Sequence, residues 1–336
     1  MKTAKSRVLT GDRPTGKLHL GHLVGSIENR IALQDSSELF YMIADAQALT
    51  DNAENPAKVS ENVLEIALDN LAAGLDPSKT TMFIQSAVPE TAELFQYFLN
   101  LVTLARAERN PTVKDEMQQK GYGTNVPLGF LTYPISQAAD IMIVKATKVP
   151  VGDDQLPMIE QTNDITEKFN RIYGETFPKT AAILSSTPRL IGTDGKAKMS
   201  KSIGNTIYLS DDDAVIVQKV MNMFTDPNHV RVEDPGKIEG NVVFTYLDIF
   251  DPAKEELALL KERYTKGGLG DVVLKKRLTK ILSEKITPIR ERRTKLAKDR
   301  EAVMKILEEG TRKVRAIATE TLDEVRTKIG INYFKN

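Results

Sequence analysis

The segment Arg7–His22, RVLTGDRPTGKLHLGH, carries the pattern that decides the fold. Its first four residues form a short strand candidate that Gly11 ends, and a glycine-rich turn follows directly. Two more apolar runs, Leu39–Ala44 and Thr81–Gln85, flank Pro56–Ala73, where apolar residues recur at nearly helical spacing. Strands separated by helix-length connections predict right-handed βαβ units and a parallel sheet.

This alternation continues through the middle of the chain and then gives way to helices. Lys148–Val151 and Ala181–Leu184 are expected to be strands, and Asp154–Ile172 a helix. Later helical patterns cover Asp211–Phe224, Asn241–Phe250, Pro252–Tyr264, Gly270–Ala297 and Arg300–Ile329. We therefore predict an α/β protein with two parts. The first is a doubly wound parallel-sheet (Rossmann-like) domain over residues 1–205; the second is an α-helical domain over residues 206–336, whose last helix can pack back on the first.

The composition excludes several classes of protein. The 336 residues include no cysteine, which excludes disulfide frameworks, thiolate zinc sites and cysteine nucleophiles. No apolar run reaches the ~20 residues of a membrane span, and no secretory signal opens the chain, so we expect a cytoplasmic protein without a membrane partner. Basic and acidic residues balance at 46 each, but residues 251–336 contain 22 basic and 14 acidic ones. A polyanion would bind there, although a solvated helical bundle would show the same excess.

The glycine-rich turn matches a P-loop in part. Gly11, Gly16 and Lys17 have the P-loop spacing, but Leu18 stands where a P-loop has the serine or threonine whose hydroxyl binds Mg²⁺. No later strand ends in a clear Walker-B aspartate. A P-loop-like ATPase is therefore the alternative from a different enzyme class.

The same turn ends in two histidines, His19 and His22, which flank Leu20 and Gly21. At the start of a helix their imidazoles lie on one face, where they and free backbone amides can hold phosphate oxygens. Gly21 has no side chain, so a flat adenine can lie against its backbone. No third ligand stands at a zinc spacing, so we expect no protein-bound structural metal. Two incidental histidines would give the same pattern, so this motif does not decide the function alone.

A second motif stands at the junction of the two parts, in the glycine-containing segment Thr193–Asn205. It places Lys196, Lys198 and Lys201 among small residues, and lysine is a flexible point charge suited to phosphate. Alone, this segment could be a basic linker. Together with the two histidines, its sequence KMSKS (198–202) resembles the signature pair of the class I aminoacyl-tRNA synthetases.

Nearly the whole chain is similar to bacterial tryptophanyl-tRNA synthetases. The stretches that carry the resemblance are GDRPTGKLHLGH (11–22), LARAERNPTVK (104–114), YPISQAAD (133–140), VPVGDDQ (149–155), GKAKMSKS (195–202), DPNHVRVEDPGKIEGN (226–241) and IGINYF (329–334). The resemblance implies a tryptophan–tRNA ligase, which joins L-tryptophan to ATP and then transfers it to the 3′ end of tRNA(Trp). It also implies ATP with Mg²⁺, L-tryptophan and tRNA(Trp) as substrates or partners.

The resemblance further implies roles for the residues of both motifs. A carboxylate is already ionised at neutral pH, so adenylate formation needs alignment and charge neutralisation rather than a general base. The implied catalytic residues are His19, His22, Lys198, Ser200 and Lys201. The implied ATP-binding residues are Arg13, Pro14, Thr15, Gly21, His22, Gly152, Asp153, Asp154, Leu190, Lys198, Met199, Ser200, Lys201 and Ser202.

Asp140 is the implied specificity residue, because an indole N–H, which can only donate, is a natural partner for a carboxylate. The rest of the implied amino-acid pocket consists of Tyr133, Gln155, Gln137, Leu9 and Gly11. Three positions depart from much of the family, which has an aromatic residue at Leu9, a histidine at Gln47 and a methionine at Gln137. The spacing of Tyr133, Gln137 and Asp140 is also that of tyrosyl-tRNA synthetases, so a tyrosine–tRNA ligase is the alternative substrate assignment.

The resemblance implies that the helical C-terminal region binds the tRNA anticodon, which would explain its positive charge. The basic candidates for this contact are Lys275, Lys276, Arg277, Arg290, Arg292 and Arg293. We also expect a two-fold symmetric homodimer through the α/β domain, around Ala87–Arg109.

Overall fold

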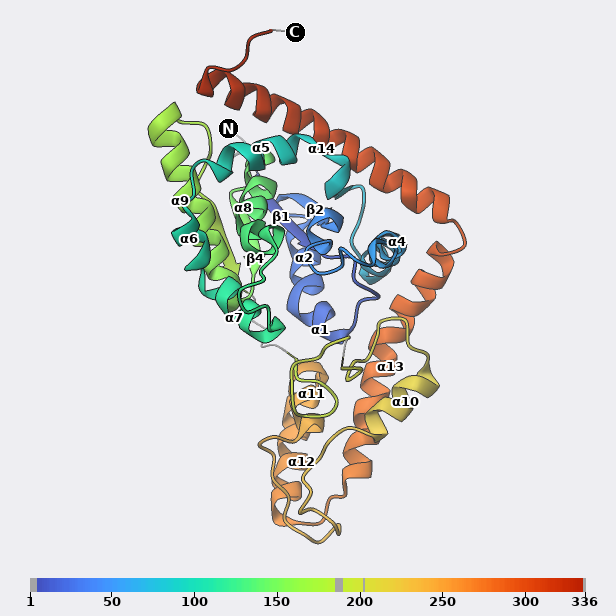
Figure 1. Cartoon of the computed structure of the whole chain (residues 1–336). Helices are drawn as coiled ribbons and strands as arrows, with labels where there is room; N and C mark the ends of the chain where they lie inside the picture. The colour runs from blue at the N-terminus through green and yellow to red at the C-terminus, as the bar shows by residue number, and fades with distance from the viewer. Residues whose placement is uncertain (1–4, 185–189, 202, 335–336) are drawn as a thin grey trace.

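The computed structural model of the chain describes residues 5–184, 190–201 and 203–334, so Ser202, which was expected to bind ATP, lies outside the described residues. It contains a parallel sheet in the order β3-β2-β1-β4-β5, which confirms the predicted doubly wound α/β architecture (Figure 1). The strands are β1 (Arg7–Asp12), β2 (Glu38–Ile43), β3 (Thr80–Ile84), β4 (Lys148–Val151) and β5 (Ala181–Leu184). Each agrees with the expected strand to within two residues.

The chain builds the sheet outward from β1 in two directions, and this sets the position of the site. β2 and β3 add to one edge of β1, and β4 and β5 then add to the other edge. The strand order therefore reverses between β1 and β4. Ligands of such sheets bind beyond the carboxyl ends of the strands at this reversal, where the glycine-rich turn follows β1 and Gly152 follows β4.

Alternation along the strands divides the core between the two faces of the sheet. In β2, Tyr41 faces the core that includes α4 (Pro56–Ala73), whereas Phe40 and Met42 face a second core on the other side. Both faces are buried, as a parallel sheet between helices requires. The other helical segments of this part are α1 (Leu20–His22), the π-helical turn η1 (Leu23–Ile27), α2 (Glu28–Leu33), α3 (Asp45–Ala48), the 3₁₀ turn η2 (Gln85–Ala87), α5 (Glu90–Leu99), α6 (Leu104–Glu108), α7 (Pro111–Lys120), α8 (Leu128–Ile143), the 3₁₀ turn η3 (Asp153–Gln155) and α9 (Leu156–Tyr173).

The C-terminal part is helical, as predicted, and Figure 1 shows α12 at the end of the molecule that lies furthest from the sheet. Helix α13 runs back from there to contact α4. The helices are α10 (Asp213–Met221), α11 (Val242–Phe250), α12 (Lys254–Lys266), α13 (Asp271–Leu296) and α14 (Arg300–Ile329). Within the described ranges, no helix is both long enough and apolar enough to cross a membrane.

The last helix, α14, packs against β3 and α5 of the sheet-containing part. Gly310 permits this approach, because a Cβ at this position would lie 1.8 Å from the carbonyl oxygen of Met82 in β3. The Thr311 hydroxyl accepts a hydrogen bond from the backbone N–H of Ile84 at 3.2 Å. Helix α14 therefore packs against the carboxyl end of β3, which residue 85 directly follows.

Candidate active site

A cavity of about 400 Å³ lies at the carboxyl ends of β1 and β4 and is bordered by α7 and α8. The predicted site residues that line it are Leu9, Gly11, Arg13, Tyr133, Gln137, Asp140, Gly152 and Gln155. All six residues that were expected to form the amino-acid pocket are among them. The fold therefore gathers these side chains from β1, α8 and η3 around one space.

Asp140 provides a buried acceptor in this cavity and is only 3% exposed. Its Oδ2 accepts a hydrogen bond from Gln85 Nε2 at 2.8 Å, and its buried Oδ1 has no hydrogen-bond partner in the described part of the chain. Burial raises the pKa of Asp140 to about 7; the Gln85 bond opposes this rise, and the charge of Asp45 adds to it. A buried acceptor without a donor is costly, so Oδ1 is suited to one N–H or O–H group of a ligand.

Further polar groups line the same cavity. The Tyr133 hydroxyl donates a hydrogen bond to Glu116 Oε2 at 3.0 Å. Burial, together with the Glu116 carboxylate, raises the pKa of Tyr133 far above its ordinary value, so the phenol stays protonated. Gln155 Nε2 donates to Asp154 Oδ2 at 3.1 Å. Groups that can orient an ammonium and a carboxylate thus lie in the same cavity as Asp140.

Gln85, Glu116 and Phe130 are among the residues in or beside the cavity that the sequence reasoning missed. Gln85 directly follows β3, and a polar residue at the carboxyl end of a parallel strand is a signal that could have identified it. Glu116 and Phe130 lie on α7 and α8, and in the sequence neither residue stands next to the end of a strand. Their position becomes evident only when α7 packs beside α8.

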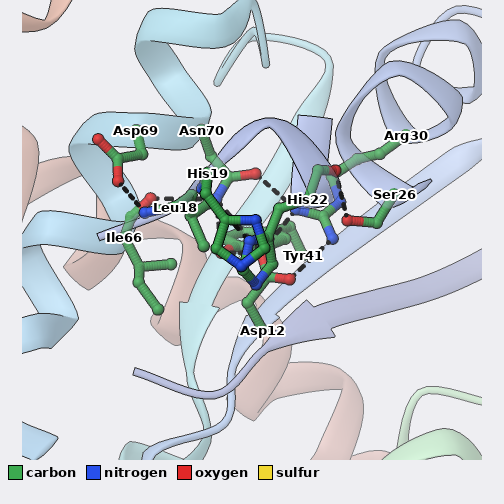
Figure 2. Close-up of polar contacts among 10 residues, drawn as sticks. All are labelled: Asp12, Leu18, His19, His22, Ser26, Arg30, Tyr41, Ile66, Asp69 and Asn70. Atoms are coloured by element: carbon green, nitrogen blue, oxygen red, sulfur yellow. Dashed lines mark hydrogen bonds and ion pairs between the residues drawn. The ribbon is translucent and has the colours of Figure 1, made fainter. Parts of the chain in front are cut away.

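The two histidines lie directly beyond β1, with their ring centroids 3.9 Å apart (Figure 2). His19 Nδ1 accepts a hydrogen bond from Gly21 N at 3.1 Å, and His22 Nδ1 accepts one from His19 N at 3.3 Å. Burial, reinforced by the charge of Lys201, lowers the pKa of His19 to about 2 and that of His22 to about 4. Both rings are therefore neutral at physiological pH. A Cβ on Gly21 would lie 3.0 Å from the His19 ring, which is tighter than an ordinary contact, so this packing favours a glycine.

The lysine-rich loop lies against the histidine motif, although the two are distant in sequence. Leu20 N donates to the Ile207 carbonyl at 2.9 Å, which ties the segment after the loop to the start of α1. Lys201 Nζ donates to the Gly16 carbonyl at 2.5 Å. Burial lowers the pKa of Lys201 to about 8. Imidazoles and an ammonium group from the two motifs therefore meet beside one turn.

The other described residues that were predicted to bind ATP do not line the cavity. Leu190 and Met199 are buried, and Met199 N donates to the Leu190 carbonyl at 3.1 Å. Ser200 N donates to Asn205 Oδ1 at 2.8 Å, and Lys198 is exposed. The remainder are Pro14, which is buried, Thr15 and Gly21, which are half-buried, and Asp153 and Asp154, which are exposed.

A buried charge network fixes the carboxyl end of β1 (Figure 2). Arg30, which is 1% exposed, donates to Asp12 Oδ2 at 2.8 Å and to Asn70 Oδ1 at 2.5 Å. The Tyr41 hydroxyl donates to the same Asp12 oxygen at 2.9 Å and accepts from Asn70 Nδ2 at 2.8 Å. Burial alone would raise the pKa of Asp12, but Arg30 outweighs it and holds that pKa well below its usual range. The network anchors the turn that carries the two histidines.

Contacts within the chain engage five of the six basic residues that were expected to face tRNA. Arg293 Nε pairs with Asp69 Oδ1 at 2.5 Å, and Lys275 Nζ donates to the Met221 carbonyl at 2.9 Å. The other three are Arg277, Arg290 and Arg292, which are held by Asp251, Asp213 and the Ala72 carbonyl. Lys276 is exposed. Five of the six candidates therefore have partners within the chain.

Comparison with known proteins identifies the class to which this site belongs. The family model for class I tRNA synthetases (W and Y) matches residues 1–286, so the chain belongs to this family of aminoacyl-tRNA ligases. Within the family it groups with the tryptophan–tRNA ligases. The tryptophan–tRNA ligase of Clostridium longisporum is 57% identical over 338 residues, which cover 99% of each protein. That of Streptococcus agalactiae serotype V is 54% identical over 339 residues, which cover 98% of this chain and 99% of the relative.

A solved structure gives the same assignment. The tryptophanyl-tRNA synthetase of Campylobacter jejuni, complexed with ADP and tryptophan, matches with a TM-score of 0.85 and 32% sequence identity. The match covers 96% of this chain and 99% of that one. The resemblance drawn from the sequence is confirmed, and the reading as a tryptophan–tRNA ligase is supported over the tyrosine and P-loop alternatives.

Proposed function

We propose that the chain activates L-tryptophan with ATP and transfers the tryptophanyl group to tRNA(Trp), using the cavity and the two motifs as follows. The carboxylate of tryptophan attacks the α-phosphorus of ATP. The bond between that phosphorus and the oxygen that bridges it to the β-phosphorus breaks, and pyrophosphate leaves. A hydroxyl of the terminal tRNA ribose then attacks the tryptophanyl carbonyl carbon. AMP leaves with the electrons of the broken carbon–oxygen bond.

The observation that carries this proposal is the unpaired Oδ1 of Asp140 in the cavity. An indole ring would enter with its N–H toward this oxygen, and its apolar faces would lie against Leu9, Met42 and Phe130. Tyr133 and Gln155 would orient the ammonium and carboxylate groups, and Gln137 and Gly11 would complete the pocket. An amino acid without a ring donor would leave a buried carboxylate oxygen unsatisfied, which gives strong discrimination.

The histidines act in this proposal as neutral donors. Because each Nδ1 accepts a backbone hydrogen bond, the proton of each neutral ring is on Nε2, which can donate to a phosphate oxygen. Lys198, Ser200 and Lys201 would close on the pyrophosphate and bind it more tightly in the transition state than in the ground state. These residues with His19 and His22 are the proposed catalytic set.

The nucleotide would lie along the turn after β1 and the segment after β4. The proposed contacts are Arg13, Pro14, Thr15, Gly21, Gly152, Asp153, Asp154, Leu190 and Met199. Mg²⁺ would enter with ATP as part of the substrate, held mainly by its phosphates.

The wider organisation that we propose follows from the same function. Residues 1–205 would form the catalytic domain and residues 206–336 the anticodon-binding region, with α14 returning to the catalytic domain. A homodimer would form around Ala87–Arg109, with the cytoplasm as the compartment in which the tRNA is met. Light scattering on the purified chain, which measures the mass in solution, tests the homodimer.

Pyrophosphate–ATP exchange with each proteinogenic amino acid tests the function. Exchange with tryptophan alone is the expected result; exchange with tyrosine alone would reassign the substrate, and exchange with neither would refute the ligase. Asp140→Asn should weaken tryptophan binding by roughly 10-fold or more while ATP binding persists. Unchanged tryptophan affinity would remove Asp140 from the pocket.

A further inference from the structure

Gln85 holds Asp140 from behind the cavity. It directly follows β3 and is 6% exposed. Its Oε1 accepts a hydrogen bond from the backbone N–H of Gln47 at 2.9 Å, and its Nε2 donates to Asp140 Oδ2 at 2.8 Å. Both ends of this amide are thus engaged, the oxygen by the backbone of α3 and the nitrogen by the Asp140 carboxylate.

The Gln47 bond fixes which way the amide faces. A backbone N–H can only donate, so the carbonyl oxygen of Gln85 must face Gln47 and the NH₂ group must face Asp140. An NH₂ group can only donate, so Asp140 must offer an acceptor to it. The Oδ2 atom is engaged in this way, and Oδ1 of this cavity-lining residue has no hydrogen-bond partner among the residues that the structure describes.

We infer that Gln85 is a positioning residue for substrate selection: it keeps Asp140 an acceptor and leaves one oxygen for one ring N–H. The inference deepens the proposed function and rests on it, because it assumes that Asp140 meets the indole. Gln85 acts through Asp140 and does not itself line the cavity.

The charges around Asp140 make this role necessary. Burial and the Asp45 carboxylate, which accepts two hydrogen bonds from Ser86, both favour the protonated form of Asp140. The Gln85 bond is the contact that favours the ionised form. The other ionisable groups that line the cavity are Asp12, Arg13, Arg30, Glu116 and Tyr133. Without Gln85, the pKa of Asp140 would rise further, and more of Asp140 would present a hydroxyl in place of an acceptor at neutral pH.

The test measures tryptophan affinity against pH. The chain contains no tryptophan, so the emission of the bound amino acid can be titrated without a protein background. Gln85→Met should weaken binding roughly 10- to 100-fold near neutral pH, and the loss should recover as the pH rises. The acid limb of the affinity profile should move to higher pH by at least about one unit. Gln34→Met is the matched control, because Gln34 is 7% exposed and also accepts from a backbone N–H, that of Asp76, and donates to a carbonyl, that of Gly74.

A substrate analogue separates positioning from loose packing. 3-Benzothienylalanine replaces the indole N–H with sulfur, so the wild-type protein should prefer tryptophan over it by at least about 10-fold. The Gln85→Met protein should show a smaller preference at neutral pH, and the preference should return at alkaline pH. If Gln85→Met does not fold, Gln85→Glu keeps the shape and the Gln47 contact while placing a second carboxyl beside Asp140, and it should move the acid limb further.

The outcomes distinguish the two proposals. If the wild-type protein shows no preference for tryptophan over the analogue, or Asp140→Asn retains it, the proposed role of Asp140 fails. If Asp140→Asn loses the preference but the Gln85 variants keep the wild-type acid limb, the inference on Gln85 alone is overturned. It is also overturned if Gln34→Met moves the acid limb as far as Gln85→Met does.

Discussion

Replacing Arg30 with methionine should destabilise the fold more than the loss of any exposed ion pair. Arg30 makes hydrogen bonds to Asp12 at 2.8 and 3.3 Å and to Asn70 at 2.5 Å, and its guanidinium carbon lies 4.7 Å from the centre of the Tyr41 ring. Methionine would fill much of the volume but would leave the Asp12 carboxylate buried without a cation. Breaking a buried pair in this way costs about 3–5 kcal/mol. We therefore expect a loss of that size in the free energy of unfolding.

Urea denaturation followed by circular dichroism measures this loss. Lys266→Met is the control, since Lys266 pairs with Glu262 on the exposed surface of α12 and its removal should have no measurable effect. A second substitution, Asp12→Asn, should restore part of the stability to Arg30→Met, because it removes the charge that lost its partner. A loss below about 1 kcal/mol in Arg30→Met, or no recovery in the double variant, would refute the view that the network anchors the turn.

The pH dependence gives an independent check on the same network. In the wild-type protein the folded-state pKa of Asp12 is depressed, so this carboxylate contributes stability above its unfolded pKa of about 3.9. That contribution is lost as the pH falls toward the folded value. In Arg30→Met only burial and weaker contacts remain, and burial raises the pKa, so acid should stabilise the variant relative to the wild type. Parallel stability profiles for the two proteins would contradict the assignment.

Three further predictions concern the loop, the last helix and the basic residues. Burial lowers the pKa of Lys201 to about 8, so kcat/KM for ATP in the exchange assay should fall above about pH 8. Lys201→Arg should abolish this fall, because arginine stays charged. A fall that persists in this variant would belong to another group. Gly310→Ala should lower the free energy of unfolding by about 1–3 kcal/mol, because its Cβ would meet the backbone of β3. Gly129→Ala is the control, because a Cβ there meets no atom within 4 Å, and it should leave the free energy of unfolding unchanged or raise it. Equal effects of the two variants in denaturation would contradict the packing argument. Lys276 is exposed, so Lys276→Glu should lower tRNA charging and spare pyrophosphate exchange. Arg293 pairs with Asp69, so Arg293→Glu should lower the melting temperature. The reverse pattern would show that Arg293 faces the tRNA.

The fold could be predicted where periodicity and end signals agree. The predicted helix Arg300–Ile329 has the bounds of α14, because Asp299 caps its start by accepting from Ala302 N at 3.0 Å and Gly330 ends it at φ 85°. The helix expected from residue 211 begins instead at Asp213. There the Asp212 side chain accepts from the backbone N–H of Val215 at 2.8 Å, so the cap lies later than the apolar pattern suggested.

From the residues alone, the site could be predicted only as far as its local motifs; the six pocket residues that line the cavity came from the family resemblance. The histidine turn and the lysine loop are each contiguous, so their spacing is visible in the sequence. Arg30, Gln85 and Glu116 are not, because each acquires its role from a partner on another element. An arginine within a helical pattern ordinarily indicates a solvated face; Arg30 is buried because Asp12 and an amide from α4 converge on it. Such pairings depend on three-dimensional packing, which periodicity does not encode.

The electrostatics of the two motifs suit a site whose ligand is a polyanion. His19, His22 and Lys201 share a partly buried space in which three positive charges would repel one another. Burial reduces that repulsion, because it keeps both imidazoles neutral and lowers the pKa of Lys201 to about 8. Under the proposed function, phosphate oxygens would accept hydrogen bonds from the neutral imidazoles and would favour the charged form of Lys201. Negative charge on the bridging oxygen grows as pyrophosphate leaves, so the attraction grows along the reaction and stabilises the transition state more than bound ATP.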